Sequence, residues 1–308
     1  MMFSRKTIGL EIATDRVRMA LVGGSRSKPV VDSVQEGVFP ADTVRVSLRE
    51  LNVLQQSSFV ATVRETSLKL LAKTSRTAVS LPDASGRVVL LDLDTRFKSR
   101  EEAVDIIRWK LKKNFPFDIN DAHFDFQVLQ ERGSGEISAL VSIVCRQVIQ
   151  QYEELLVEAG LEPNQIDFTS FRLFELFAYK LALGENYLFV THMAGVLSIM
   201  LFNQGILTFY RTKELAGRGF SVNRVYREIS SSLLVCQDKN LGFSGGKVYC
   251  FTDNAHAEEF RSIMADATEQ EPILLDVAKV VGLSPSCNID AATLFKMSAA
   301  FGAAVRNL

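Results

Sequence analysis

Ile8-Gly-Leu-Glu-Ile-Ala-Thr-Asp-Arg-Val-Arg-Met-Ala-Leu-Val22 is typical of two apolar strands joined by a polar turn at residues 13–16. A shift of 180 residues along the chain places it on Leu188-Phe-Val-Thr-His-Met-Ala-Gly-Val-Leu-Ser-Ile-Met-Leu-Phe202, which has the same pattern with its turn at the same place. This repeat predicts that two halves of the chain begin with the same hairpin.

Strand and helix patterns alternate after each copy of the hairpin. We therefore predict a duplicated α/β fold of the actin-like (ribonuclease-H-like) class, with a central cleft and inserted subdomains, as in the actin, hexokinase and Hsp70 group. The expected first half is 1–185, with an inserted subdomain at about 84–165. The second half is 186–308, with a reduced subdomain at about 212–248 and a last helix, 290–308, that packs back on the first half.

Helical periodicity is clearest in three places. Residues 57–73 carry an apolar stripe, and a last helix begins at Asp290. Ser99 and Glu102 form a capping box that opens a further helix, which Pro116 ends. The apolar positions of these three helices are Val60, Val63, Leu68 and Leu71; Leu294, Met297, Phe301, Val305 and Leu308; and Val104, Ile107, Leu111 and Phe115.

The composition excludes several classes of partner. The chain has 35 Lys and Arg against 36 Asp and Glu, a net charge of −1, which argues against a general nucleic-acid binder and against electrostatic binding to a membrane. Phenylalanine is in excess, with 21 Phe against 6 Tyr and 1 Trp. Because Phe has no polar tip, the excess points to buried surface, either core or a dry partner groove.

The compartment is predicted from cysteines and apolar runs. The four cysteines are scattered without a C-x-x-C pair, which indicates small buried side chains in a reducing cytosol. Charged residues interrupt the N-terminal apolar run, so we expect no signal peptide. Residues 187–202 fall short of the ~20 residues of a membrane span and contain a turn, so we expect strands there.

The stretches that begin at Ile8, Phe115, Ala159 and Ala299 resemble motifs of the PilM family of actin-like type IV pilus assembly proteins, which is related to FtsA. Ile8-Gly-Leu-Glu-Ile12 lies where the family has Ile-Gly-(Leu/Ile)-Asp-Ile-Gly. Further likenesses are Phe115-Pro-Phe-Asp118 with His123-Phe-Asp-Phe126, Ala159-Gly-Leu-Glu-Pro163 with Ile166-Asp167, and Ala299-Ala-Phe-Gly-Ala-Ala-Val-Arg306. Their order and spacing identify the chain as a member of this family over nearly its whole length.

The resemblance implies a nucleotide site that this sequence has lost. In the superfamily, ATP phosphates rest on the two hairpin turns, where glycine lets backbone N–H groups approach and a strand-end Asp handles the metal. Here Glu11 and Ala13 stand at the Asp and Gly positions of the first turn, and Thr191 and Met193 at those of the second. The adenosine turn is replaced by Thr252-Asp-Asn254. We therefore expect no cofactor, with ATP disfavoured, and no enzymatic activity.

Other chemical signals are weaker. The stretch Gly242-Phe-Ser-Gly-Gly-Lys247 lacks the first glycine and the Ser or Thr of a P-loop, and we interpret it as a loop. Gly217-Arg-Gly219 is interpreted as structural. Asp92 and Asp94 are expected at a solvated strand end, and the three histidines lie far apart, so we predict no acid/base pair and no metal site.

The resemblance also implies a partner. PilM-like proteins bind the short N-terminal tail of PilN, a single-span inner-membrane protein, in a groove at the cytoplasmic face of that membrane. The candidate partner-binding residues are Trp109, Phe115, Phe117 and Asp118, with plain subdomain core as the alternative for the aromatics. Two other functions stay open, a divergent ATP-binding actin-like protein and the cytoplasmic actin-like component of a type II secretion system. Self-association is also open.

Overall fold

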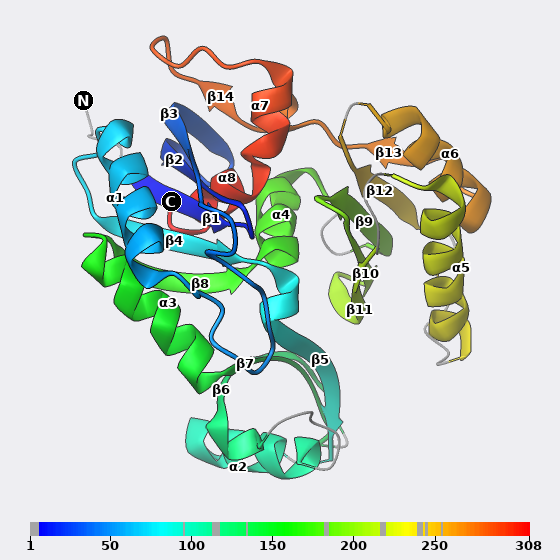
Figure 1. The fold of residues 1–308 in the computed structure, drawn as a ribbon. Coiled ribbons are helices and arrows are strands. Elements are labelled where there is room, and N and C mark those ends of the chain that lie inside the picture. Colours follow the sequence, from blue (N-terminus) through cyan, green and yellow to red (C-terminus); the bar gives the residue numbers. More distant parts are fainter. Residues whose placement is uncertain are drawn as a thin grey trace.

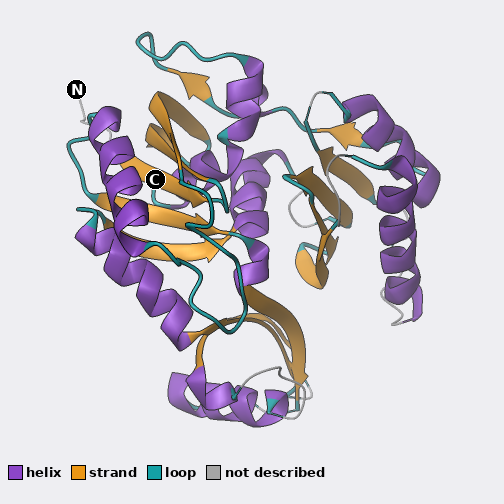
Figure 2. Cartoon of the chain, in the orientation of Figure 1, coloured by secondary structure: helices purple, strands orange, loops and turns teal. Residues whose placement is uncertain are grey.

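The computed structural model describes residues 6–94, 96–112, 118–133, 135–181, 185–215, 220–238, 243, 246–253 and 255–308. These residues form three sheets, with helices on the two larger ones and one helix below the smallest (Figure 1, Figure 2). The strand orders are β14-β3-β2-β1-β4-β8, β11-β10-β9-β12-β13 and β5-β7-β6.

The strands and helices have the following bounds. The strands are β1 (Thr7–Ile12), β2 (Arg16–Ser25), β3 (Lys28–Val38), β4 (Arg76–Leu81), β5 (Gly86–Leu93), β6 (Ala122–Glu131), β7 (Ile137–Cys145), β8 (Glu162–Phe168), β9 (Tyr187–Met193), β10 (Val196–Asn203), β11 (Ile206–Glu214), β12 (Lys247–Phe251), β13 (Ile273–Leu274) and β14 (Gly282–Leu283). The helices are α1 (Gln56–Leu70), α2 (Arg100–Leu111), α3 (Arg146–Glu158), α4 (Thr169–Phe177), α5 (Val222–Asp238), α6 (Ala257–Thr268), α7 (Ala291–Lys296) and α8 (Ser298–Arg306).

The repeat predicted from the sequence holds in the strand pairing. Ile8 lies opposite Leu21 in the β1–β2 hairpin, and Leu188 lies opposite Leu201 in the β9–β10 hairpin. A register shift follows directly after Leu21 where β2 pairs with β3, and directly after Leu201 where β10 pairs with β11. The parallel strands β4 and β12 then join β1 and β9. The predicted duplicated α/β architecture is therefore confirmed, and the two halves also share the position of a register shift that the sequence did not predict.

Glycine allows the C-terminal helix α8 to approach the first sheet closely. A Cβ built on Gly9 of β1 would lie 1.9 Å from the carbonyl oxygen of Ala300 in α8. Where α8 contacts α4, a Cβ on Gly302 of α8 would lie 1.9 Å from the carbonyl oxygen of Arg172 in α4. Both contacts involve backbone atoms, so α8 can lie against β1 and α4 only because these two positions lack a side chain.

The small sheet β5-β7-β6 has two faces with different neighbours. Phe124 of β6 and Ile143 of β7 lie opposite each other and pack against Ile107 and Leu111 of α2. The intervening residues, such as Asp125 and its partner Ser142, point to the other face because successive side chains alternate along a strand. In Figure 1, α2 lies at the lower end of this sheet, away from the rest of the molecule.

Some local predictions need correction. In α1, Val60 and Val63 are buried as predicted, but Leu68 and Leu71 are 68% and 84% exposed. The helix ends at Leu70, so Leu71 leaves it in a left-handed conformation, and Leu68 lies outside the buried stripe. The single last helix is in fact two, α7 and α8, separated at Met297. Asp290 caps the first of them by accepting from the Thr293 N–H.

The capping box of α2 forms in part as predicted. The Glu102 N–H donates to the Ser99 hydroxyl at 3.2 Å, whereas the Glu102 carboxylate accepts from the Lys98 N–H at 2.6 Å. The predicted inserted subdomain at 84–165 contains α3 and β8, yet β8 pairs with β4 in the six-stranded sheet. Residues 187–202 form the hairpin β9–β10, and within the described ranges no helix has the length and apolar character needed to cross a membrane.

Candidate functional site

The first hairpin turn is occupied by an internal ion pair. The Glu11 carboxylate, 5% exposed at the end of β1, accepts from the Arg18 guanidinium of β2 at 3.0 Å. Arg18 also donates to Glu36 of β3 at 2.9 Å. The Glu11 carboxylate thus has its counter-ion within the hairpin itself. Ala13 is partly exposed within the same turn.

The second hairpin turn has no carboxylate. Thr191 and Met193 are 2% and 6% exposed, and Met193 belongs to a buried apolar cluster. His192 packs edge-on against Phe220, with ring centroids 5.2 Å apart, and burial lowers the pKa of His192. Of the predicted adenosine turn, Asn254 lies outside the described residues, as do 217 and 219 and half of the predicted 242–247 loop. No three His, Cys, Asp or Glu side chains in the described ranges gather to hold a metal ion.

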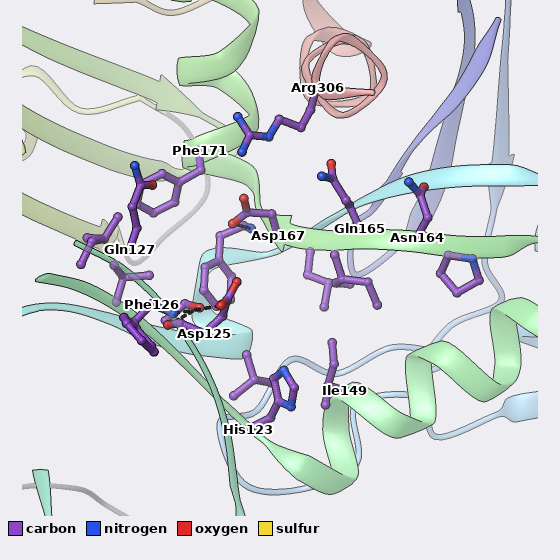
Figure 3. Close-up of a pocket in the computed structure, with 18 of the residues that line it drawn as sticks. His123, Asp125, Phe126, Gln127, Ile149, Asn164, Gln165, Asp167, Phe171 and Arg306 are labelled. Carbon is purple, nitrogen blue, oxygen red and sulfur yellow. Dashed lines mark hydrogen bonds between the residues drawn. The ribbon is translucent and has the colours of Figure 1, made fainter. Parts of the chain in front are cut away.

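A groove separates the small sheet from the six-stranded sheet and has a volume of about 340 Å³. Figure 3 shows Asp125, Phe126 and Gln127 of β6 on one wall, the β8 residues Asn164, Gln165 and Asp167 on the other, and Arg306 reaching in from the end of α8. The remaining lining residues are Leu81, Val88, His123, Leu140, Ser142, Val144, Ile149, Glu153, Pro163, Ile166, Phe168 and Phe171.

The strand β8 presents its edge to this groove. It is the last strand of the six-stranded sheet, and residues 163–167 line the groove consecutively rather than alternately. If one face of the sheet bordered the cavity, only every second residue of the strand would line it. The backbone N–H and C=O groups on the outer side of β8 are therefore accessible to a bound extended chain.

A second cavity of about 360 Å³ continues the groove toward the second half of the chain. Both cavities share Gln127, Leu140, Asp167, Phe171 and Arg306. The second is closed on its far side by residues of the β10–β11 turn region, namely Met200, Phe202, Gly205, Ile206 and Leu207. The small sheet and both halves of the chain thus meet in one continuous depression.

A partly buried polar cluster joins the two halves next to the groove. The Ser170 N–H and hydroxyl donate to the Asp83 carboxylate, and the Tyr210 hydroxyl of β11 donates to it at 3.2 Å. The Tyr210 ring stacks on the groove residue Phe171, with centroids 5.0 Å apart. Burial raises the pKa of Asp83 to about 6, although the hydrogen bonds from Ser170 and Tyr210 oppose this shift.

Two polar groups beside the groove, one on β8 and one on α4, lack hydrogen-bond partners in the described part of the chain. The Gln165 Oε1 and the Arg172 Nε are buried without a hydrogen-bond partner in the described part of the chain. Arg172 is 3.9 Å from the Asp167 carboxylate, whose pKa is raised by burial. Such groups favour a ligand that supplies the missing partners.

The residues predicted as partner contacts lie apart from this groove or outside the described residues. Trp109 is 78% exposed on the outer face of α2, on the other side of the small sheet. Asp118 accepts from the Asn120 N–H at 3.0 Å and caps a single 3₁₀ turn. Phe115 and Phe117 lie outside the described residues. A contact between these four residues and a partner stays a prediction.

Sequence reasoning missed the β8 wall and Phe171. Pro163 and Ile166-Asp167 belong to the family resemblance, but the sequence does not predict that they contact a partner. A signal was available in the sequence, namely a strand with polar residues directly after the helix that becomes α3. Such a strand is suited to the edge of a sheet, where its backbone is open to binding.

The geometry defines the class of fold, and structural comparisons agree. The chain resembles a Bacteroides thetaiotaomicron protein with an actin-like ATPase fold and unknown function, at TM-score 0.51 and 13% identity over 95% of this chain and 96% of that one. It also resembles the cytoplasmic domain of EpsL, an inner-membrane component of the Vibrio cholerae type II secretion system, at TM-score 0.52 and 10% identity over 96% and 94%. The fold is therefore actin-like.

A further structure and the sequence define the family. A chain from the PilM–PilN type IV pilus biogenesis complex matches at TM-score 0.80 and 16% identity, over 98% of each chain. Residues 9–227 match the family of the type IV pilus assembly protein PilM, and the chain belongs to this family. No curated protein matches the sequence.

Proposed function

We propose that this protein is a non-catalytic scaffold of type IV pilus assembly that holds the short N-terminal tail of a PilN-like inner-membrane protein. It would act at the cytoplasmic face of that membrane. The observation that carries the proposal is the groove between the small sheet and the free edge of β8. A preformed groove beside an unpaired strand edge is suited to an extended peptide, which gains backbone hydrogen bonds along the edge.

The charges of the groove indicate what the tail carries. Of the described residues that line it, Asp125, Glu153 and Asp167 are acidic and Arg306 is basic, but the Asp125 carboxylate is already paired with Arg100 of α2. Arg306 is also 3.4 Å from Glu175, which offsets part of its charge. The other two carboxylates, Glu153 and Asp167, favour a basic residue in the tail. Ile149, Ile166 and Phe168 offer apolar contacts for its neighbours.

A substitution in the middle of the groove tests this proposal. Ser142 of β7 points into the groove, so in Ser142→Arg a long cationic side chain should fill it and repel a basic residue of the tail. We expect a fluorescent peptide that copies the tail of the organism's PilN-like protein to bind at micromolar strength or better. Its affinity, measured by fluorescence anisotropy, should fall at least about tenfold in the variant, roughly 1.4 kcal/mol.

Ser138 provides the matched control. It lies four residues earlier on the same face of β7 and does not line the groove. Ser138→Arg should bind the peptide like the parent protein. Equal binding by both arginine variants would place the tail elsewhere and contradict the proposal.

We propose further that the nucleotide site of the fold is degenerate in this protein. The support is the Glu11–Arg18 ion pair in one turn and the buried Met193 beside Thr191 in the other. Adding Mg-ATP should therefore leave the melting temperature unchanged, whereas a ligand at 100 times its dissociation constant would add about 2.7 kcal/mol of stability. A clear rise in a thermal-shift titration would instead favour a divergent ATP-binding actin-like protein.

The similarity to EpsL keeps a type II secretion role as a second candidate. Co-purification from the native membrane distinguishes the two machines, because it recovers the inner-membrane partner itself.

A further inference from the structure

The outer face of α2 carries an exposed aromatic between two acids. Glu102, Asp105, Ile106 and Trp109 follow one another at helical spacing and line a shallow hollow of about 670 Å³. We call these four residues the α2 outer face. Trp109 is the only tryptophan of the chain and is 78% exposed.

The fold does not explain this exposure. The buried residues of α2 are Ala103, Ile107 and Leu111, on the side of the helix opposite Trp109. Ile106 lies between the two sides and is partly buried against the same core. The peptide groove lies beyond the small sheet, so Trp109 and the groove are on different sides of that sheet. An indole left in water forgoes the stabilisation that its burial would give, and tryptophan is enriched among the residues that dominate protein interfaces.

The cations of α2 contact the small sheet, although Arg108 also pairs with Asp105 of the α2 outer face. Arg100 stacks on Phe126, with its guanidinium 4.9 Å from the ring centroid, and Arg108 lies over Phe124 at 5.9 Å. Lys110 donates to the Asp92 carbonyl oxygen. Arg100 and Lys110 are therefore held toward the small sheet, whereas Arg108 contacts both the sheet and the α2 outer face.

The carboxylates remain around the indole. Asp105 is 2.9 Å from Arg108 but is itself 75% exposed. Glu102 uses one oxygen to accept from the Lys98 N–H. The α2 outer face therefore combines an accessible indole with two acids, which is the surface that a lysine or arginine side chain prefers.

We propose that the α2 outer face docks a basic segment of a partner protein. One Lys or Arg of that segment lies on the Trp109 ring between Glu102 and Asp105, and an apolar neighbour packs on Ile106. This contact is separate from the peptide groove and does not depend on it. An anionic membrane surface is not the occupant, because the two carboxylates would repel its headgroups.

Trp109 reports on its own surface, because no other tryptophan contributes to the emission. The probe is a short synthetic peptide that alternates arginine with leucine, and its counterpart carries glutamate in place of arginine. The arginine peptide should shift Trp109 emission to shorter wavelength and protect it from acrylamide, and the effect should weaken with salt. The glutamate peptide and phosphatidylglycerol vesicles should cause no shift.

Charge-removing variants complete the test. In the double variant Glu102→Gln with Asp105→Asn, the affinity for the arginine peptide should fall at least about tenfold. The control is Glu65→Gln with Glu154→Gln, which removes two exposed acids elsewhere and should bind like the parent. Ser142→Arg should leave the response intact. The proposal is overturned if the parent shows no shift, if both double variants bind equally, or if Ser142→Arg abolishes the response. A shift with vesicles but not with the peptide would also overturn it.

Discussion

Replacing Gly302 by alanine should destabilise the protein by about 3 kcal/mol or more, even though helix propensity alone favours alanine by about 1 kcal/mol. The added Cβ would lie 1.9 Å from the Arg172 carbonyl oxygen and 2.6 Å from its carbon. Since these are backbone atoms of α4, no side-chain rotation relieves the clash. The two helices must separate, and α8 also covers β1 at Gly9.

Urea denaturation measures this change as a lower unfolding midpoint with an unchanged slope. The control is Gly133→Ala, because a Cβ at Gly133 meets nothing within 4 Å and its stability should stay close to that of the parent. An alanine at 302 that leaves the midpoint unchanged, or raises it, would show that α8 and α4 are further apart than described.

The second large effect is a dependence of stability on pH that Asp83 imposes. Its pKa is about 6 in the folded protein, against an ordinary value of 3.8. Between these values the folded state binds more protons than the unfolded state, so stability must fall as the pH rises through this window. The full shift corresponds to roughly 3 kcal/mol, which is present below pH 4 and lost above pH 6.

Other groups titrate in the same range, so the measurement compares the parent with Asp83→Asn. The difference in unfolding free energy between them should change in favour of the parent by about 2 to 3 kcal/mol as the pH falls from 7 to 4. Tyr210→Phe removes a donor that favours the charged carboxylate, so it should make the dependence steeper. Parallel pH profiles for the parent and Asp83→Asn would refute the assignment.

The sequence predicts the hairpins well because their pattern is local. Alternating apolar residues at 8–12 and 17–22, with a turn between them, specify strand pairing without reference to the rest of the chain. The breaks at Leu71 and Met297 are less predictable. Both depend on how a helix ends against its neighbours, and the apolar spacing continues through them.

The groove could not be predicted because it is made by long-range contact. Its walls come from β6 and β8, which are joined through β7 and α3 and belong to different sheets. The sequence predicts Trp109 as a groove residue, but the structure exposes it on α2. An aromatic residue in a helix looks the same in sequence whether it faces a core, a groove or water. The packing of Phe124 and Ile143 against α2 shows that the opposite face of the small sheet, with Ser142, borders the groove.

Because the two hairpins share one register, each residue of the first has a structurally equivalent residue in the second. Glu11 faces Arg18 across the first hairpin, and the corresponding residues, Thr191 and Ser198, face each other across the second. The same backbone thus carries a charged cross-strand pair in one half and a neutral hydroxyl pair in the other. The polarity of each hairpin has therefore been able to diverge by side-chain replacement alone, without any insertion, deletion or change of strand alignment.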